Sequence, residues 1–370
     1  MADEGDPGNL EAQLAPLRAR IDEIDEQLVR LINERAQVAL RIGEAKREAG
    51  GIDAAVYVPH RERAVLEKIR GLSAGPLPAG TLEAIWREIM SGSVRLQAPL
   101  RVAYLGPAGS FSHAAAMGKF GASVQYVDST DIASVFEAVA RGHADHGLVP
   151  VENSTQGGIA ETLDAFVSTA ARLCGEVVIA VHHHCLCRGP WEDVKIVASK
   201  PEVFAQCRRW LSSAAREKEV RPVASSSAAA ELAARDPTVA ALAGRLASEI
   251  HDVPILFEEV EDRPDNLTRF LVLGREPAGR TGDDKTGILF VTGDEPGALA
   301  AVLAAFQAEG VNLTDIEKRP SGRTNWDYAF FIDAQGHTDD EALQRAIAAA
   351  RAHCRELRVL GSYPRAVEVL

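Results

Sequence analysis

The chain has 370 residues, more than one typical domain holds, which predicts two or three domains. A formal net charge of −13 argues against sequence-independent nucleic-acid binding, because that activity needs a basic face. The acidic, polar start shows no signal-peptide pattern, and the apolar runs are far shorter than a membrane span. The five cysteines are too sparse for a disulfide framework. We therefore expect a cytoplasmic protein with neither a membrane nor a nucleic-acid partner.

Residues 10–48 are predicted to form one long amphipathic helix. Its apolar side chains recur at alternating steps of three and four residues, which is a heptad seam: Leu14, Leu17, Ile21, Ile24, Leu28, Leu31, Val38 and Ile42. At ~1.5 Å per residue the helix would be about 58 Å long. Such a helix normally needs a partner, often a second copy of itself. Two shorter helices are expected at 59–69 and 81–97.

Arg35 occupies the apolar seam between Leu31 and Val38. A buried guanidinium is costly unless an anion meets it. One interpretation is a polar residue that sets the register of a coiled coil. The other is an anion site, because further polar side chains lie on the same or neighbouring helices: Arg18, Lys46, Arg61, Glu62, Ser93 and Gln97.

From Leu100 onward, short strands and helices alternate in an α/β pattern. Strands are expected at 101–105, 147–151, 177–187, 195–199, 239–244 and 269–274, and helices at 112–120, 131–142, 202–215 and 227–236. The stretch VHHHCLC (181–187) falls in the third strand. There His183, Cys185 and Cys187 would share one face, and both a zinc site and a packed strand fit this spacing.

Three polar segments adjoin the central strands: GPAGSFS (106–112), VPVENSTQGG (149–158) and NLTRF (266–270). Ser110 or Ser112 can cap the helix that follows the first segment, and a helix N-terminus can bind a carboxylate. The same segment, taken alone, is also an ordinary strand-to-helix turn. It does not match the dinucleotide fingerprint G-x-G-x-x-G.

A polar, Gly- and Asp-rich stretch near 275–285 predicts a linker. Beyond it the order of predicted elements is βαββαβ, which is the ferredoxin-like split βαβ arrangement.

The first region resembles the all-helical chorismate mutase domain over residues 10–98. The shared residues are Leu17-Arg18, Ile21-Asp22, Ile24-Asp25, Leu28, Leu31, Glu34-Arg35, Lys46, Arg61-Glu62, Ser93-Val94 and Gln97, with matching spacings. The resemblance implies a domain-swapped helical dimer. It places Arg35, together with Arg18 of the partner subunit, on the carboxylates of chorismate. Lys46 and Gln97 would contact its ether oxygen and Glu62 its ring hydroxyl. Arg61 and Ser93 would also lie at the substrate.

A pericyclic rearrangement needs no nucleophile and no metal. It needs a compressed conformer and positive charge where negative charge develops. Val58 departs from the family, some of whose members have an aspartate at this position.

The central region resembles the prephenate dehydratase domain over residues 100–276. The motifs that carry this are Gly106-Pro107-x-Gly109-Ser110-Phe111-Ser112, Val149-Pro150-x-Glu152-Asn153-Ser154-x-x-Gly157 and Asn266-x-Thr268-Arg269-Phe270, with SKPEVFAQC (199–207) and SSSAAA (225–230) as further patches. The implied fold is two α/β lobes, like those of periplasmic solute-binding proteins, with the site in the cleft between them.

Thr268 would then hydrogen-bond the leaving hydroxyl of prephenate. Because a threonine is a weak acid, we predict a proton relay through Glu152, His113 or water. Asn153, Ser154, Gln206 and Ser225 would orient the substrate, Ser110 and Phe270 would contact it, and Arg269 would hold a carboxylate or brace the loop. Neither reaction needs a metal, so we expect no cofactor and interpret VHHHCLC as a packed strand crossing between the lobes.

The last region, 286–363, resembles the amino-acid-binding ACT domain. The motifs are Pro296-Gly297-Ala298-Leu299 and Glu317-Lys318-Arg319-Pro320, followed by Trp326, Tyr328, Phe330, Phe331 and Asp333. Family members that respond to phenylalanine have serine where this chain has Lys318. A Gly turn would offer N–H groups to the carboxylate of an amino acid, and the acidic strand would accept its ammonium. A plain ferredoxin-like dimerisation module is the alternative.

This order of domains resembles the bifunctional enzymes of phenylalanine biosynthesis that join a mutase (8–98), a dehydratase (100–276) and an ACT domain (285–363). The chain would convert chorismate to prephenate and then to phenylpyruvate, under feedback inhibition by L-phenylalanine, as a homodimer or higher homo-oligomer. Two alternatives stay open. One is a monofunctional prephenate or arogenate dehydratase whose helical domain only dimerises, and the other is a non-catalytic binding protein that uses the two-lobed cleft.

Overall fold

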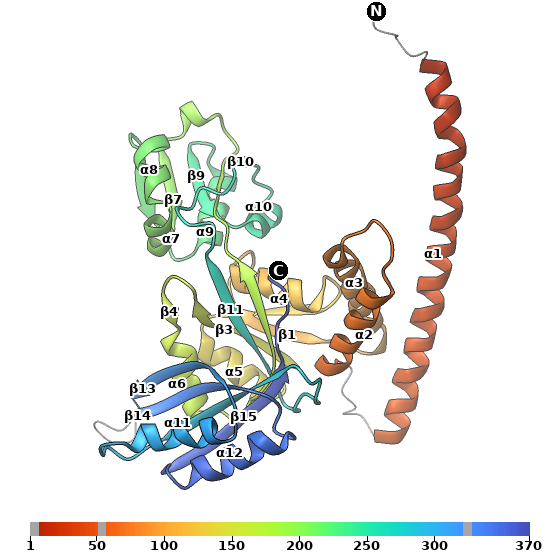
Figure 1. The fold of residues 1–370 in the computed structure, drawn as a ribbon. Helices are drawn as coiled ribbons and strands as arrows, with labels where there is room; N and C mark the ends of the chain where they lie inside the picture. Colours follow the sequence, from red (N-terminus) through yellow and green to blue (C-terminus); the bar gives the residue numbers. More distant parts are fainter. Residues whose placement is uncertain (1–6, 51–56, 321–327) are drawn as a thin grey trace, which may run out of the picture.

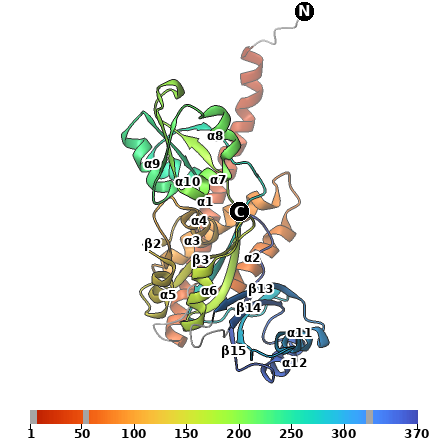
Figure 2. The ribbon, with the colours of Figure 1, turned by 90° about the vertical axis from the view of Figure 1, so that its left-hand side faces the viewer.

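The structure is a computed structural model that describes residues 7–50, 57–320 and 328–370. Figure 1 shows three parts: a helical domain, a two-lobed α/β domain, and a four-stranded domain against the first lobe. Figure 2 shows the second lobe, the first lobe and the four-stranded domain stacked in that order. The predicted combination of fold classes is therefore confirmed.

The helical domain consists of α1 (Pro7–Gly50), α2 (Pro59–Leu72) and α3 (Ala79–Gln97). Pro59 suits the first turn of α2, where its missing N–H has no intrahelical partner. The N-terminal half of α1 projects away from the rest of the chain (Figure 1) and leaves its apolar seam exposed at Leu17, Ile21, Leu28 and Leu31. A 44-residue helix with an uncovered apolar stripe is unusual for a chain that acts alone.

The first lobe is a mixed sheet in the order β2-β1-β3-β11-β5, with β4 paired to β3. Its strands are β1 (Arg101–Leu105), β2 (Gln125–Ser129), β3 (His146–Asn153), β4 (Gly157–Gly158), β5 (Arg172–Ala180) and β11 (Leu267–Gly274). Its helices are α4 (Phe111–Phe120), α5 (Ile132–Ala140) and α6 (Ala160–Ser168). Strands β3, β5 and β11 read as nearly continuous apolar runs because both faces of this sheet are covered.

The second lobe is a five-stranded sheet in the order β10-β6-β9-β7-β8. Its elements are β6 (His184–Leu186), the 3-10 turn Trp191–Asp193, β7 (Ile196–Ser199), α7 (Pro201–Gln206), α8 (Arg208–Ala214), β8 (Glu219–Pro222), α9 (Ser226–Arg235), β9 (Val239–Ala243), α10 (Arg245–His251) and β10 (Ile255–Phe257). The chain crosses between the lobes twice, from β5 to β6 and from β10 to β11.

Two sequence-based elements needed correction. The expected strand 177–187 is two strands in two sheets, because the chain leaves the first lobe at Val181 and the amide of His183 donates to the Glu261 carboxylate at 2.9 Å instead of to a neighbouring strand. The expected helix 202–215 breaks at Cys207, whose φ of −112° and ψ of 26° are not helical. The predicted crossing between lobes is confirmed.

The four-stranded domain has the predicted βαββαβ order: β12 (Asp284–Val291), α11 (Ala298–Ala308), β13 (Leu313–Pro320), β14 (Tyr328–Gln335), α12 (Glu341–Arg351) and β15 (Glu356–Pro364). Its antiparallel sheet runs β13-β14-β12-β15. One face packs on α11 and α12 through Phe290 and Phe306. The other face joins the core of the first lobe, where Phe331 stacks on Phe166 with ring centroids 5.7 Å apart.

Candidate active sites

The first candidate site is a cavity of about 260 Å³ between α1, α2 and α3. It brings together six of the seven polar residues predicted from the helical region: Arg35, Lys46, Arg61, Glu62, Ser93 and Gln97. The guanidinium of Arg35 donates to the Ser93 hydroxyl at 3.0 Å, and that hydroxyl donates to the carbonyl of Ile89 at 2.8 Å. Burial lowers the pKa of Arg35, so an anion in the cavity would be met by a poorly solvated cation.

The seventh predicted residue, Arg18, lies outside this cavity. Its side chain is 61 % exposed and pairs with Glu11 along α1 at 2.5 Å. Val58 lines the cavity and adds an apolar contact in place of a carboxylate.

Glu62 is held from two directions. The hydroxyl of Tyr57 and the ammonium of Lys119 each donate to its Oε2 atom at 2.7 Å. Burial and the nearby Glu62 charge raise the pKa of Tyr57, so it stays a donor. Lys119 belongs to α4 of the first lobe, and its neighbour Phe120 also lines the cavity. The helical cavity therefore has one wall from the two-lobed domain.

The second candidate site surrounds Thr268, on β11. The amide of Asn153 donates to the Thr268 hydroxyl at 2.8 Å, from the directly paired position on β3. The amide oxygen of Asn153 accepts from the backbone N–H and the hydroxyl of Thr155, at 3.0 and 2.6 Å, which fixes the amide orientation. Ser154 accepts a hydrogen bond from the Leu267 amide at 2.9 Å and so ties the loop to β11. The Asn153 amide thus fixes the orientation of the Thr268 hydroxyl, which stays able to donate its own hydrogen.

The turn before α4 reaches from the first lobe to the second. Ser110 caps α4 by accepting from the amide of His113 at 3.2 Å. Gly109 has φ of +82°, and an added Cβ would lie 2.9 Å from the Ser227 hydroxyl and 3.2 Å from Cα of Ala247. Ser227 follows Ser225 and Ser226 at the start of α9 and donates to the Ala108 carbonyl, so the two lobes meet here without room for a side chain.

His113 stacks on Tyr104, with ring centroids 4.6 Å apart, and its Nδ1 atom accepts from the Gly109 amide at 3.2 Å. Burial lowers the pKa of His113, which keeps the ring neutral. This orientation leaves Nε2 as the only ring atom available for a proton relay. Ser225 caps α9 by accepting from the Ala228 amide at 3.0 Å.

Gln206 contacts the crossing between the lobes. Its side-chain oxygen lies 2.7 Å from Nε2 of His183 and so accepts a hydrogen bond from that ring. His183 is 1 % exposed, and Phe111 of α4 packs edge-on against it. The predicted position of Gln206 therefore depends on His183, a residue to which the sequence assigned no part in the dehydratase site.

Three residues assigned to the dehydratase site lie away from the Thr268 hydroxyl: Glu152, Arg269 and Phe270. Side chains alternate across a sheet, so Glu152 and Arg269 face away from Asn153 and Thr268 and meet each other at 3.8 Å. A direct relay from Glu152 to Thr268 is therefore wrong for this arrangement. Phe270 is 1 % exposed and packs in the core with Tyr104 and Val272, so it cannot contact a substrate.

A third candidate site lies in the four-stranded domain, where two adjoining cavities of about 170 and 580 Å³ share Ala298. Gly297, with φ of +88°, begins α11 at the larger cavity, and Leu299 and Lys318 line the smaller one. The ammonium of Lys318 lies 3.4 Å from the centre of the Tyr328 ring. The predicted Gly turn and Lys318 thus border the two adjoining cavities of the four-stranded domain.

The other polar residues of that motif are not in these cavities. Glu317 lies against Gly158 of β4, and Arg319 pairs with both oxygens of Asp164 on α6 at 2.8 and 2.7 Å. The expected effector contacts of Glu317 and Arg319 are wrong because β13 turns alternate side chains toward the first lobe. Pro320 ends β13 and is exposed, and Trp326 lies outside the described residues.

The histidines and cysteines of VHHHCLC make no cluster. Cys185 and Cys187 are buried in the core of the second lobe, and burial raises the pKa of both thiols, which disfavours thiolate ligands. Among residues 7–50, 57–320 and 328–370, no group of three or more histidine, cysteine or carboxylate side chains is placed to hold a metal ion. In the same ranges, no helix combines the length and hydropathy of a membrane span.

Family models match all three regions. The model described as chorismate mutase type II matches residues 17–98, the prephenate dehydratase model matches 102–278, and the ACT domain model matches 286–352.

Relatives match nearly the whole chain. The chain is 41 % identical to the bifunctional chorismate mutase/prephenate dehydratase of Aquifex aeolicus, over 96 % of this chain and 99 % of that protein. It is 42 % identical to the enzyme of the same name from Pseudomonas aeruginosa, over 96 % and 98 %. A solved structure of the prephenate dehydratase of Arthrobacter aurescens in complex with L-Phe is 33 % identical, with a TM-score of 0.68, and covers 72 % of this chain and 90 % of that one. The order of domains in this chain, and its identity to the two bifunctional relatives over nearly their full length, show that the chain belongs to the family of bifunctional chorismate mutase/prephenate dehydratases.

Proposed function

We propose that this bifunctional enzyme of phenylalanine biosynthesis rearranges chorismate in the helical cavity, within domain limits of 8–98, and converts prephenate to phenylpyruvate at Thr268, within 100–276. The observation that carries the first assignment is the convergence of Arg35, Lys46 and Arg61 on one cavity that also holds Gln97. Chorismate is a dianion, and three cations that line one cavity match it.

In the mutase cavity, Arg35 and Arg61 bind substrate carboxylates, and Lys46 and Gln97 donate to the ether oxygen as its bond breaks. Glu62 accepts from the ring hydroxyl, oriented by Tyr57 and Lys119. Ser93 holds Arg35 in place. These groups favour the compact, chair-like conformer and stabilise the charge that develops in the transition state.

In the dehydratase, Thr268 donates to the departing ring hydroxyl, and Asn153 orients it. The proton reaches Thr268 through water or through Nε2 of His113, because Nδ1 of that ring is already occupied by the Gly109 amide. Ser110, Ser154, Gln206 and Ser225 shape the substrate site around the cleft. Aromatisation drives loss of water and CO2, so the protein has to protonate one group and leave the departing carboxylate poorly solvated.

The assembly is a homodimer or higher homo-oligomer in the cytoplasm, built on α1. The exposed apolar seam of α1 supports this, since a second copy would cover it. In such a dimer, Arg18 of the partner subunit would reach the cavity. Sedimentation of the wild type against Leu28→Glu tests this: dissociation together with loss of mutase activity is expected, and an unchanged mass would contradict it.

The ACT domain, within 285–363, binds L-phenylalanine as a feedback inhibitor. Support comes from the cavities beside Gly297 and Lys318 and from the L-Phe complex of the relative from Arthrobacter aurescens. The ring of an aromatic amino acid would lie with Leu299, Tyr328 and Phe330.

One incubation tests the whole proposal. Purified protein is given chorismate alone, and phenylpyruvate is followed with and without L-phenylalanine. Formation of phenylpyruvate without added cofactor, lowered by L-phenylalanine, is expected. Turnover of added prephenate but not of chorismate would instead make this a monofunctional dehydratase with a helical domain that only dimerises.

A further inference from the structure

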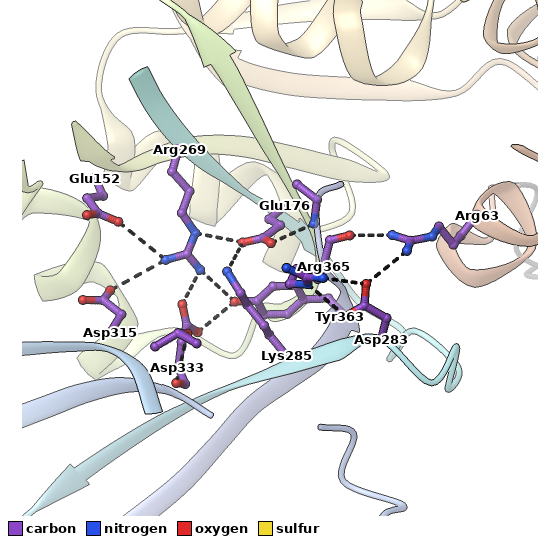
Figure 3. A network of polar contacts seen from close by, with 12 residues as sticks. Arg63, Glu152, Glu176, Arg269, Asp283, Lys285, Asp315, Asp333, Tyr363 and Arg365 are labelled. Carbon is purple, nitrogen blue, oxygen red and sulfur yellow. Dashed lines mark hydrogen bonds and ion pairs between the residues drawn. The ribbon is translucent and has the colours of Figure 1, made fainter. Parts of the chain in front are cut away.

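Arg269, next to Thr268 on β11, points away from the substrate side and into a buried cluster of charges. Its side chain is 11 % exposed. From its own domain it meets Glu176 at 2.8 Å and Glu152 at 3.8 Å. Figure 3 shows that its other partners come from strands of the ACT domain.

The ACT domain supplies three of these partners. Arg269 donates to Asp333 of β14 and to the hydroxyl of Tyr363 of β15 at 2.9 Å, and lies 3.7 Å from Asp315 of β13 (Figure 3). Tyr363 in turn donates to the second oxygen of Asp333 at 2.8 Å. Asp333 is fully buried, so its charge has no solvent to stabilise it apart from these contacts.

Carboxylates outnumber cations in this cluster: Glu152, Glu176, Asp315 and Asp333 surround Arg269 and Lys285. Burial alone would lower the pKa of Arg269, but Tyr363, Asp333 and Glu176 raise it above its ordinary value, so the cation persists. Lys285 of β12 adds a second cation, 3.1 Å from Glu176. Removing one partner of a buried charge cluster leaves the others uncompensated, which is far costlier than losing a surface pair. The position of Arg269, and with it the backbone of Thr268, is therefore fixed by the ACT sheet.

Strands β13 and β14 contact the first lobe with one face, and their other face borders the smaller cavity of the ACT domain, which is the proposed effector cavity. Lys318, Tyr328 and Phe330 line that cavity, whereas Asp315 and Asp333 are paired across the strands and face Arg269. Asp333 lies three residues beyond Phe330 on β14, which is about 10 Å at the usual rise of a strand. A ligand that displaces β14 at Phe330 would displace Asp333 as well.

We propose that Asp333 and Tyr363 of the ACT domain are positioning residues of the dehydratase: they hold Arg269, and through it Thr268, and the effector acts on dehydration by moving this contact. The inference rests on the proposed roles of Thr268 and of L-phenylalanine. It goes further, because it names the contact that links the effector cavity to β11, the strand that carries Thr268.

The test compares Asp333→Asn, Tyr363→Phe and Asp164→Asn in the full-length protein. Asp164→Asn is the matched control, because it breaks another ion pair between the dehydratase and ACT domains, with Arg319, that does not involve Arg269. We measure kcat and KM for prephenate, inhibition by L-phenylalanine, and mutase turnover of chorismate. We expect kcat to fall at least tenfold in Asp333→Asn and about threefold in Tyr363→Phe, with KM changed less than twofold. The L-phenylalanine concentration for half-inhibition should rise at least fivefold in both.

The outcomes separate this inference from the function it rests on. Mutase turnover reports that each variant is folded, and Tyr363→Phe, which removes one oxygen, decides the matter if Asp333→Asn is insoluble. Wild-type kcat and wild-type inhibition in both Arg269-cluster variants, or equal effects in Asp164→Asn, would overturn the inference. A wild-type protein that does not turn over prephenate would overturn the proposed function instead.

Discussion

The ammonium group of Lys119 donates to the carboxylate of Glu62 over 2.7 Å, across the boundary between the dehydratase and mutase domains. Lys119 lies near the end of α4, and Ser110 caps the start of the same helix next to Gly109, where the two lobes meet. One ten-residue helix of about 15 Å thus connects the two candidate sites.

Replacing Lys119 by Met should lower mutase kcat/KM about tenfold. Glu62 would lose one of its two donors, and a hydrogen bond to a charged group contributes about 1.5–3 kcal/mol. Chorismate consumption measures the effect, with Lys68→Met, an exposed lysine on α2, as control. Equal mutase activity in Lys119→Met and wild type would show that the contact only joins the domains.

Replacing Thr268 by Ala should lower dehydratase kcat at least 100-fold and leave the mutase unchanged, because the oriented hydroxyl is lost from only one site. Thr268→Ser is the informative partner, since it keeps a hydroxyl within reach of the Asn153 amide. It should retain activity within about tenfold of the wild type. Phenylpyruvate formation from added prephenate is the measurement, and near wild-type turnover in the alanine variant would remove Thr268 from the mechanism.

The sequence predicted which residues share a site better than it predicted which way they point. The mutase set was identified because all of its members belong to the three helices of one domain, and all but Arg18 line one cavity. Glu152, Glu317 and Arg319 were assigned to the wrong side because facing follows from strand register, and register depends on pairing with distant strands.

Contacts between domains were the part that sequence reasoning missed. Asp333 lies 64 residues from Arg269, and Lys119 lies 57 residues from Glu62. Nothing in the local sequence around Lys119 or Tyr363 distinguishes it from an ordinary helix or strand residue. The only available signal was Arg269 itself, a cation that begins the apolar strand segment RFLVLG, because a cation buried there requires buried anions from other parts of the chain.

Replacing Gly109 by Ala should lower dehydratase kcat more than tenfold. The added Cβ would lie 3.2 Å from Cα of Ala247, which cannot move aside as a flexible side chain would, so the lobes would be forced apart where they meet. Gly310→Ala is the matched control, because Gly310 also has positive φ, +68°, but an added Cβ there would meet nothing within 4 Å. Both should lose about 1 kcal/mol of stability from backbone strain, and only Gly109→Ala should lose activity. Equal activity in the two variants would show that the lobes tolerate this separation.

His146 should make the enzyme less stable in mild acid. It packs against Tyr57 and Phe120, with ring centroids 5.1 and 5.7 Å away, and its Nδ1 atom lies 3.2 Å from the Leu273 carbonyl. Burial lowers the pKa of His146 to about 4. Below an ordinary histidine pKa of about 6.5, the unfolded chain binds a proton that the folded chain does not, so stability falls as pH falls from about 6.5 toward 4.

For this one group the loss between pH 7 and pH 5 is about 2 kcal/mol. Urea unfolding of wild type and His146→Gln at both pH values measures it, and the loss on acidification should be smaller in the variant by that amount. His143→Gln, which changes an exposed histidine just before β3, should keep the wild-type difference. If His146→Gln loses as much stability as the wild type between pH 7 and pH 5, the acid sensitivity arises elsewhere in the chain.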